Sequence, residues 1–220
     1  MASEPPLVLA FDTAAAHCAA ALVRGDAVLA RRHEPMERGQ AERLLPMLEE
    51  MLAEAGVAWT DLDGLGVATG PGNFTGLRIA VAAARGLALA LDRPAVGVTV
   101  FEAIAAGIPG PSLVVLPDRP RGVFAQRFRD GVAEAAPVAG EPGTLGPFDP
   151  ATTVAGLDAA GIAGELGLRP GPSEARADPA VVASLAAARL GTAPPPVPFY
   201  LRAPDAMPPR EPAPMILDDA

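Results

Sequence analysis

Short apolar runs and turn residues alternate at the start of the chain. Residues 7–11 form a continuous apolar run that ends in Asp12-Thr13, which is typical of a buried strand with polar side chains at its carboxyl end. Two further strand-like runs, 18–23 and 27–32, flank the tight turn Arg24-Gly25-Asp26. The pattern predicts an antiparallel meander of three strands.

Helical spacing of apolar residues begins at Gln40. Leucines and methionines recur as far as Ala55 at intervals of three and four residues, opposite charged residues that are mostly glutamates. We expect an amphipathic helix over 40–55 that is ended by Gly56. Pro46 has no amide proton and is expected to kink this helix or to confine its regular part to the residues after it.

A second helix is predicted over 76–91, after a short strand at 65–68. Twelve of its 16 residues are Ala, Val, Ile or Leu, and its two charges, Arg78 and Arg85, lie seven residues apart on one line. Such a helix requires burial on several sides. One side can lie on its own sheet, and the small residues elsewhere allow close approach by the helix at 40–55 or by a second protein.

The first half then closes with a strand at 95–98 and a capping box, Thr99-Val100-Phe101-Glu102, that opens another helix. The element order is three antiparallel strands, helix, strand, helix, strand and helix. This is the order of a ribonuclease H-like domain, the unit that actin-like phosphotransferases use twice.

The second half repeats this order less clearly. It has strand patterns at 113–116 and 123–129, turn residues over 137–150, a possible strand at 161–164, and a helix that Asp178-Pro179 opens and Gly191 ends. We therefore predict an α/β protein of two tandem ribonuclease H-like (actin-like ATPase, ASKHA) domains, the second reduced. The expected divisions are 1–105, 106–203 and a flexible proline-rich tail over 204–220.

The glycine-rich turn Gly70-Pro71-Gly72-Asn73-Phe74-Thr75-Gly76 stands between a strand and a helix. Its glycines permit a close backbone approach, and Asn73 or Thr75 can cap the helix whose first amides favour anions. A P-loop is excluded because the chain contains no lysine, and the glycine spacing fits a dinucleotide fingerprint poorly. A tight turn and a phosphate cradle both remain open.

Composition narrows the function classes. The chain has 220 residues, a net charge of −9 and a pI near 4.7, which disfavours unaided binding to nucleic acid. Cys18 is the single cysteine, so an internal disulfide is impossible and a reducing compartment is expected. The start lacks the basic region of a signal peptide, and Arg85 interrupts the longest apolar stretch. We expect a soluble cytoplasmic protein with no membrane contact.

Catalytic equipment is hard to find. His17 and His33 are the only histidines, and their spacing matches no helical or hairpin pair of metal ligands, so no metal site is predicted. No GxSxG motif is present, and Cys18 is interpreted as a core thiol. Asp12 is interpreted either as a group that positions a metal or water near phosphate or as a cap of its strand. No catalytic residue is predicted.

Four stretches together resemble the TsaB (YeaZ) family. They are Leu9-Ala10-Phe11-Asp12-Thr13-Ala14, Arg43-Leu44-Leu45-Pro46-Met47, the glycine-rich turn with Leu77-Arg78, and Phe199-Tyr200-Leu201-Arg202. The resemblance is specific over residues 7 to about 105 and looser over 106–197. Two positions depart from the family pattern: Gln40 stands where many members have histidine, and the stretch from Asp118 to Phe124 is one residue short.

The resemblance implies a non-catalytic role and a set of partners. Members of this family are the inactive relatives of TsaD in the machinery that makes N6-threonylcarbamoyladenosine at position 37 of tRNA. TsaD is the expected direct partner, TsaE joins the pair, and tRNA is reached only through the complex. The chain is expected to bind no cofactor on its own, with ATP or ADP possible only in the complex, and a homodimer is possible in isolation. A stand-alone small actin-like ATPase or kinase is the main alternative, and a peptidase is a weaker one.

Two sets of site residues follow. A vestigial phosphate-binding set comprises Asp12, Thr13, Gly70 and Gly72. The expected partner interface combines an apolar stripe of the helix at 40–55 with a line of small and basic residues on the helix at 76–91: Leu48, Met51, Leu52, Thr75, Arg78, Ala82, Arg85 and Gly86.

Overall fold

Five strands form a mixed sheet in the order β3-β2-β1-β4-β5, in a computed structural model that describes residues 4–118 and 122–201. β1 (Leu7–Asp12), β2 (His17–Arg24) and β3 (Ala27–Pro35) are antiparallel. β4 (Gly64–Ala68) and β5 (Ala95–Val98) run parallel to β1. The predicted three-stranded meander is confirmed.

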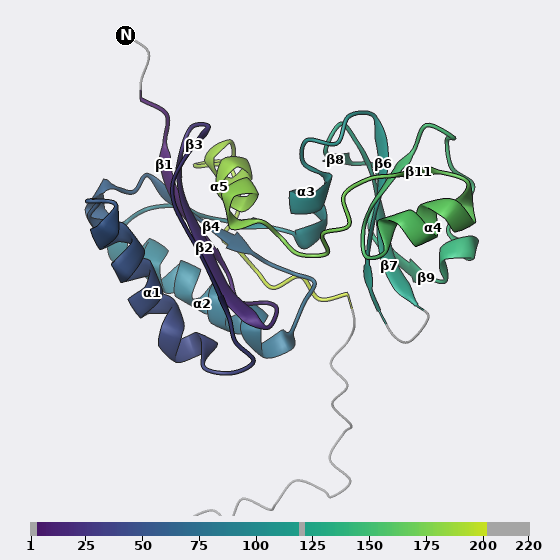
Figure 1. The fold of residues 1–220 in the computed structure, drawn as a ribbon. Coiled ribbons are helices and arrows are strands. Elements are labelled where there is room, and N and C mark those ends of the chain that lie inside the picture. Colours follow the sequence, from purple (N-terminus) through teal and green to yellow (C-terminus); the bar gives the residue numbers. More distant parts are fainter. Residues whose placement is uncertain (1–3, 119–121, 202–220) are drawn as a thin grey trace, which may run out of the picture.

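Helices α1 (Gln40–Glu54) and α2 (Phe74–Leu91) cover one face of this sheet (Figure 1). The buried residues of α1 recur at intervals of three and four, which is why the stretch folds as a helix on the sheet: Leu44, Met47, Leu48, Met51 and Leu52. The helix starts before Pro46 and continues through it, so the proline does not confine the regular part. A short 3₁₀ turn, Trp59–Asp61, connects α1 to β4.

The opposite face is covered by α5 (Pro179–Ala187), whereas α3 (Val100–Ala105), which follows β5, packs on the strands at 111–117, 132–133 and 153–156. α5 lies against β1, β2, β4 and β5, although it comes from the C-terminal part of the chain (Figure 1). Gly66 of β4 permits this contact, because a Cβ there would lie 3.2 Å from Ala186 Cβ and 3.3 Å from Val182 Cγ1. α5 ends at Ala187 and not, as predicted, near Gly191.

A second sheet has the order β11-β10-β6-β7-β8, and β9 also pairs with β7. Its strands are β6 (Pro111–Pro117), β7 (Val123–Arg129), β8 (Val132–Ala133), β9 (Val138–Gly140), β10 (Thr153–Gly156) and β11 (Arg169–Pro170). The 3₁₀ turn Pro142–Thr144 and helix α4 (Ala159–Leu166) accompany it.

The strand predicted at 161–164 is wrong, because these residues lie inside α4. The Asp158 carboxylate accepts a hydrogen bond from the Gly161 amide and starts the helix, and Gly167 ends it in a left-handed conformation. Ala159, Ile162 and Ala163 are buried at helical spacing on the second sheet. The run was too short for its period to separate a helix from a strand.

Both sheets have the same strand order, with β6, β7, β10 and β11 in the positions of β1, β2, β4 and β5. The fold is therefore the predicted pair of tandem ribonuclease H-like domains. We call the domain with the sheet β3-β2-β1-β4-β5 lobe one and the domain with the sheet β11-β10-β6-β7-β8 lobe two. One buried cluster contains Val8 and Ala10 of β1 together with Val114 and Leu116 of β6. The lobes thus share a core, and α5, which the predicted boundary assigns to lobe two, packs on lobe one. The tail over 204–220 lies outside the described residues.

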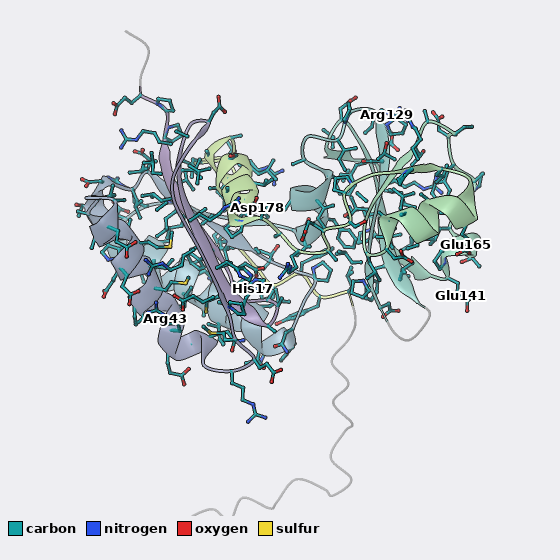
Figure 2. The ribbon with its side chains drawn as sticks, viewed as in Figure 1. His17, Arg43, Arg129, Glu141, Glu165 and Asp178 are labelled. Carbon is teal, nitrogen blue, oxygen red and sulfur yellow. The ribbon has the colours of Figure 1, made fainter. Side chains whose placement is uncertain are left out.

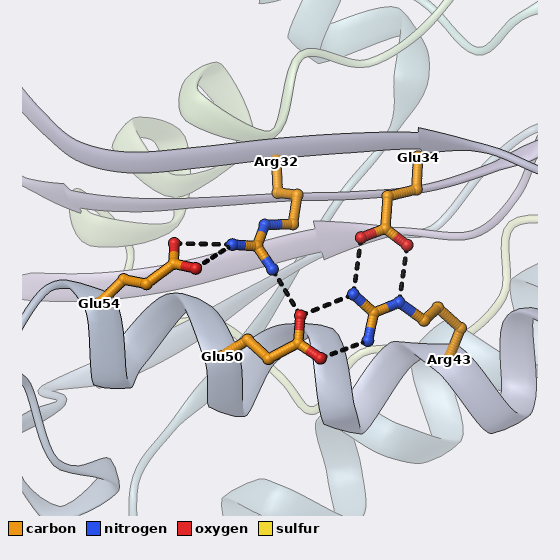
Figure 3. Close-up of polar contacts among 5 residues, drawn as sticks. All are labelled: Arg32, Glu34, Arg43, Glu50 and Glu54. Carbon is orange, nitrogen blue, oxygen red and sulfur yellow. Dashed lines mark hydrogen bonds and ion pairs between the residues drawn. The ribbon is translucent and has the colours of Figure 1, made fainter.

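The outer edge of lobe one carries an ion-pair network between β3 and α1 (Figure 3). The Arg43 guanidinium donates to both Glu34 and Glu50 at 2.7 Å, and Arg32 donates to Glu50 and Glu54 at 2.6 Å. Glu50 and Glu54, on the charged side of α1, thus hold this helix to the edge strand. Hydrogen bonds from Arg43 lower the pKa of Glu34 and of Glu50.

Candidate functional site between the two lobes

The carboxyl ends of β1 and β6 face a cavity of about 850 Å³ between the lobes, which we call the interlobe cleft. Asp12 ends β1, and Asp118 follows β6 at the corresponding position of lobe two. The glycine-rich turn, the start of α2 and residues 199–201 form other parts of its wall. The cleft lies where ligands of open α/β sheets usually bind.

Asp12 is 2% exposed and already has partners at the cleft wall. Its Oδ1 accepts a hydrogen bond from the Ala14 amide at 2.7 Å, and its Oδ2 lies 3.1 Å from His17 Nε2. Figure 2 labels His17 on the sheet of lobe one. This geometry matches the interpretation of Asp12 as a strand cap that also reaches the cleft.

The two histidines lie closer together than their sequence spacing suggested. His17 and His33 are diagonal neighbours across the β2–β3 pair, with ring centroids 4.9 Å apart. The hairpin places them on one face of the sheet, a contact that the register of the meander could have predicted. Within residues 4–118 and 122–201, no group of three or more His, Cys, Asp or Glu side chains is arranged to hold a metal ion.

The glycine-rich turn packs directly on the residues that follow β1. The Asn73 amide donates to the Ala14 carbonyl at 2.6 Å, and Thr13 Oγ1 donates to the Gly76 carbonyl at 2.7 Å. A Cβ on Gly72 would lie 2.6 Å from the Ala14 carbonyl oxygen, and one on Gly76 would overlap the Thr13 carbonyl. These glycines are therefore needed for backbone contact within the chain.

Asn73 caps α2, because its side-chain oxygen accepts a hydrogen bond from the Gly76 amide at 3.0 Å. The helix consequently starts at Phe74, two residues before the predicted position. Gly70 lies at φ 103°, a conformation that favours glycine. The proposed phosphate-binding set, Asp12, Thr13, Gly70 and Gly72, is thus brought together, but Asp12 and Thr13 bond within the chain and a Cβ on Gly70 or Gly72 would crowd neighbouring residues.

The C-terminal aromatic segment completes the cleft. The Phe199 amide donates to the Thr69 carbonyl at 2.8 Å, which fixes the segment beside the end of β4. The Tyr200 ring stacks on the Phe74 ring, with centroids 5.2 Å apart. The Arg78 guanidinium also lies over the Phe74 ring, 3.9 Å from its centre. Arg78 Nε also donates to the Tyr200 hydroxyl at 3.1 Å. The sequence analysis named the glycine-rich turn and the segment at 199–202 but did not predict that they contact each other. Arg202 lies outside the described residues.

The outward face of α2 is the second candidate site. Only 28% of its 18 residues are buried, and Leu89 is 87% exposed. The five expected interface residues on this helix are all exposed: Thr75, Arg78, Ala82, Arg85 and Gly86. In the described part of the chain, α2 alone has the length and apolar composition of a membrane span, a weak indication because core helices also meet that criterion.

The other three expected interface residues have a different place. Leu48, Met51 and Leu52 are at most 2% exposed and pack with Leu7, Leu9 and Phe11 of β1. Their stripe faces the sheet of lobe one, so the structure corrects their assignment to a partner surface. Leu45, which is 44% exposed, is the large apolar side chain that α1 leaves in solvent.

Cys18 is a buried thiol of the lobe-one core. Burial raises its pKa to about 11, and the negative charge of Glu34 adds to the shift. Its Sγ lies 3.7 Å from the Gln40 carbonyl oxygen. These surroundings suppress the thiolate, as expected for an unreactive core thiol.

The stretch from Asp118 to Phe124, which is one residue shorter than the family pattern, includes residues 119–121, which lie outside the described residues.

The two lobes have the actin-like fold, and the amides of Asn73 and Gly76 in the glycine-rich turn bond within the chain. A family model described as TsaD, tRNA N6-adenosine threonylcarbamoyltransferase, matches residues 34–118. The chain belongs to the TsaB/YeaZ family.

Three similar proteins support this membership. An uncharacterised protein of Mycobacterium tuberculosis is 38% identical over 204 residues, which cover 91% of this chain and 94% of that protein. The tRNA threonylcarbamoyladenosine biosynthesis protein TsaB of Escherichia coli is 38% identical over 100 residues, or 46% of this chain and 43% of TsaB. A crystal structure from Pseudomonas aeruginosa, described as similar to the peptidase YeaZ, has a TM-score of 0.73 at 28% identity and covers 90% of this chain and 100% of that chain.

Proposed function

We propose that this protein takes part in the biosynthesis of tRNA threonylcarbamoyladenosine as a non-catalytic subunit that binds and supports TsaD. Relatives named TsaB are described as proteins of this biosynthesis, and the TsaD family model matches the part of the chain from the end of β3 to the end of β6. The same interpretation gives the transfer chemistry to the partner and a binding role to this chain.

The observation that carries the proposal is the exposed face of α2. A helix made mostly of alanine, leucine and valine leaves Ala82, Gly86 and Leu89 uncovered by the rest of the described chain. A Cβ placed on Gly86 would have no described atom within 4 Å apart from its chain neighbours and the nearby backbone of α2 itself. Small residues let a second helix approach closely, and exposed apolar patches of this kind mark interaction sites. Arg78 and Arg85 border the face with positive charge.

The remaining partners follow from this assignment. TsaE would join the complex of this chain with TsaD, and ATP or ADP would bind only there. tRNA would be reached through the complex, because the net charge of −9 opposes binding by this chain alone. In the absence of TsaD, two copies of the chain could pair through the same face of α2.

A stand-alone ATPase or kinase has less support. The chain has no lysine to contact phosphates, and the amides of Ala14, Asn73 and Gly76 donate within the chain. Thr13 Oγ1 also bonds to the chain's own backbone. A nucleotide would have to displace these contacts, which disfavours a phosphate cradle at this turn.

The test is a Gly86→Leu substitution, measured by calorimetric titration with the TsaD of the same organism. Leucine has room in the isolated chain but would overpack a helix contact, so affinity should fall by about tenfold to a hundredfold while the melting temperature stays the same or rises. Ala160→Leu on α4 is the matched control, because it also introduces leucine at a small, exposed helical residue.

Activity is the second measurement. A reconstituted system containing TsaD, TsaE, ATP and tRNA should form threonylcarbamoyladenosine with the wild-type chain and markedly less with Gly86→Leu. Wild-type affinity of the Gly86→Leu variant for TsaD would refute the assignment of α2. Failure of the wild-type chain to bind TsaD at all would refute the proposed function itself.

A further inference from the structure

We propose that residues 215–219 of the same chain dock on the exposed face of α2 in the isolated protein, and that TsaD must displace them in order to bind. The docking is independent of TsaD, whereas its effect on TsaD binding rests on the proposed function. Three observations carry the inference: the uncovered apolar face, the place where the described part of the chain ends, and the chemical match between the face and residues 215–219.

The outward face of α2 carries an apolar stripe that the described residues leave exposed. Ala82, Gly86 and Leu89 follow one another on it at intervals of four and three residues, and Leu89 is 87% exposed. Only 28% of the helix is buried, although its composition is apolar enough for a membrane span. Covering such a stripe with other apolar side chains is favourable, because it removes apolar surface from water.

The described part of the chain ends beside the first turn of this helix. Tyr200 stacks on Phe74, with ring centroids 5.2 Å apart, and its hydroxyl accepts a hydrogen bond from Arg78 Nε at 3.1 Å. The 18 residues of α2 extend over about 27 Å. Residues 202–214 can span up to about 40 Å, so they are long enough to bring residues 215–219 to any point of the face.

The sequence of residues 215–219 matches the chemistry of the face. Met215-Ile216-Leu217 is the longest run of large apolar side chains after Leu201, and Asp218-Asp219 follows it directly. Arg85 borders the apolar stripe, is exposed, and forms no ion pair with the described residues. The apolar run can therefore cover the stripe while an aspartate pairs with Arg85.

The covalent connection makes a weak contact sufficient. A tethered segment has an effective concentration in the millimolar range, so a contact with a dissociation constant of about 1 mM keeps the face covered in about half of the molecules or more. A partner then binds only the uncovered fraction, and its apparent affinity is lowered in proportion. Residues 215–219 thus shield α2 from weakly binding apolar surfaces and leave it accessible to a partner that binds strongly.

A nitroxide label on Ala220→Cys of the full chain tests the docking without TsaD. Cys18 should stay unlabelled at neutral pH, because burial raises its pKa to about 11. The amide signals of Ala82, Gly86 and Leu89 should lose intensity through paramagnetic relaxation, whereas those of α4 in lobe two should not. A mixture of nitroxide-labelled chain with isotope-labelled chain that carries no nitroxide should show no such loss, because the contact forms within one chain.

Variants of the apolar run test its role. The double variant Ile216→Ser and Leu217→Ser should restore the α2 signals, whereas Met207→Ser, which lies in the same segment but outside the run, is the matched control and should not. Arg85→Gln should weaken the docking by about twofold, the size expected for an exposed ion pair. In calorimetric titrations, the double variant should bind TsaD about twofold to fivefold more tightly than the wild-type chain, and Met207→Ser should bind like the wild type. Melting temperatures show whether each variant is folded.

Three results would overturn the docking. They are an absence of signal loss on α2, a loss of equal size in the mixed sample, which would mean that a second copy of the chain covers the face, and a loss that persists in the double serine variant. Wild-type affinity of the double variant for TsaD would refute the competition between residues 215–219 and TsaD. Failure of every variant and of the wild-type chain to bind TsaD would refute the proposed function, and the nitroxide experiment would still decide the docking.

Discussion

Lobe one and lobe two share a strand order but differ in how completely it is built. Lobe one covers its sheet with α1 and α2 on one face and α5 on the other. Lobe two has no helix in the position of α1, where residues 141–152 contain a 3₁₀ turn, and its α4 has 8 residues where α2 has 18. Five of these 12 residues are proline or glycine, which explains why no α-helix forms there.

The difference shows which parts of the actin-like fold each lobe retains. The turn after β4 spans five residues and includes Gly72, which contacts Ala14, whereas only Leu157 and Asp158 separate β10 from α4. Both lobes keep the strands that border the cleft, and they bury one common cluster. The cleft therefore persists, while the helix with the large exposed face belongs to lobe one.

The largest expected effect is the loss of the backbone contact made by the glycine turn. Gly76→Ala should destabilise the protein by about 3 kcal/mol, because the new Cβ would overlap the backbone carbonyl of Thr13, which cannot move aside as a flexible side chain could. Gly86→Ala in the same helix, where a Cβ has open space, should instead stabilise by about 0.5–1 kcal/mol. Urea unfolding of the two variants measures both, and equal effects would show that the turn is not tightly packed.

Cys18 reports on lobe one alone, since lobe two has no thiol. Its pKa is raised from 9.0 to about 11, so the folded state retains a proton that the unfolded chain loses above pH 9. Stability should therefore be intact below pH 9 and fall by about 2.5 kcal/mol as pH rises towards 11. Cys18→Ala should flatten this decline in chemical unfolding experiments, and an unchanged slope would contradict the burial argument.

Val182 on α5 tests whether the C-terminal helix supports lobe one. Val182→Ala removes two buried methyl groups and should cost about 1.5 kcal/mol. Amide hydrogen exchange should accelerate more in β1 and β4, which contact α5, than in β10. Faster exchange confined to lobe two would instead assign α5 to the lobe from which its sequence comes.

The smallest expected effect concerns the ion-pair network at the edge of lobe one. The pKa values of Glu34 and Glu50 are lowered by hydrogen bonds from Arg43, so their stabilisation is present above the ordinary glutamate pKa and is lost as pH falls below it. Arg43→Gln should therefore lower the melting temperature slightly at pH 7 and reduce its dependence on pH between 5 and about 3. Arg129→Gln, which breaks an exposed pair with Glu134 in lobe two, is the control.

The local sequence pattern was sufficient to predict most of the helices and strands of lobe one. The apolar runs predicted the strands, the spacing of Leu44, Met51 and Leu52 predicted α1, and the absence of lysine excluded a P-loop. These features depend on residues close together in the chain, whose period and turn chemistry determine the local conformation. The same reasoning was weakest at 161–164, where the run was short, and it misplaced the start of α2 by two residues.

Only the tertiary structure determined which residues of distant segments contact each other. An amphipathic stripe shows that one face of α1 is buried but not whether a sheet or a partner buries it, so Leu48, Met51 and Leu52 were assigned outward. The return of α5 to lobe one, the Tyr200 and Phe74 stack and the approach of His17 to His33 all join distant segments. Sequence spacing carries no record of such contacts, because they depend on how the sheets pair and how their faces pack. The sequence determined the elements, and the packing of those elements determined the cleft and the free face of α2.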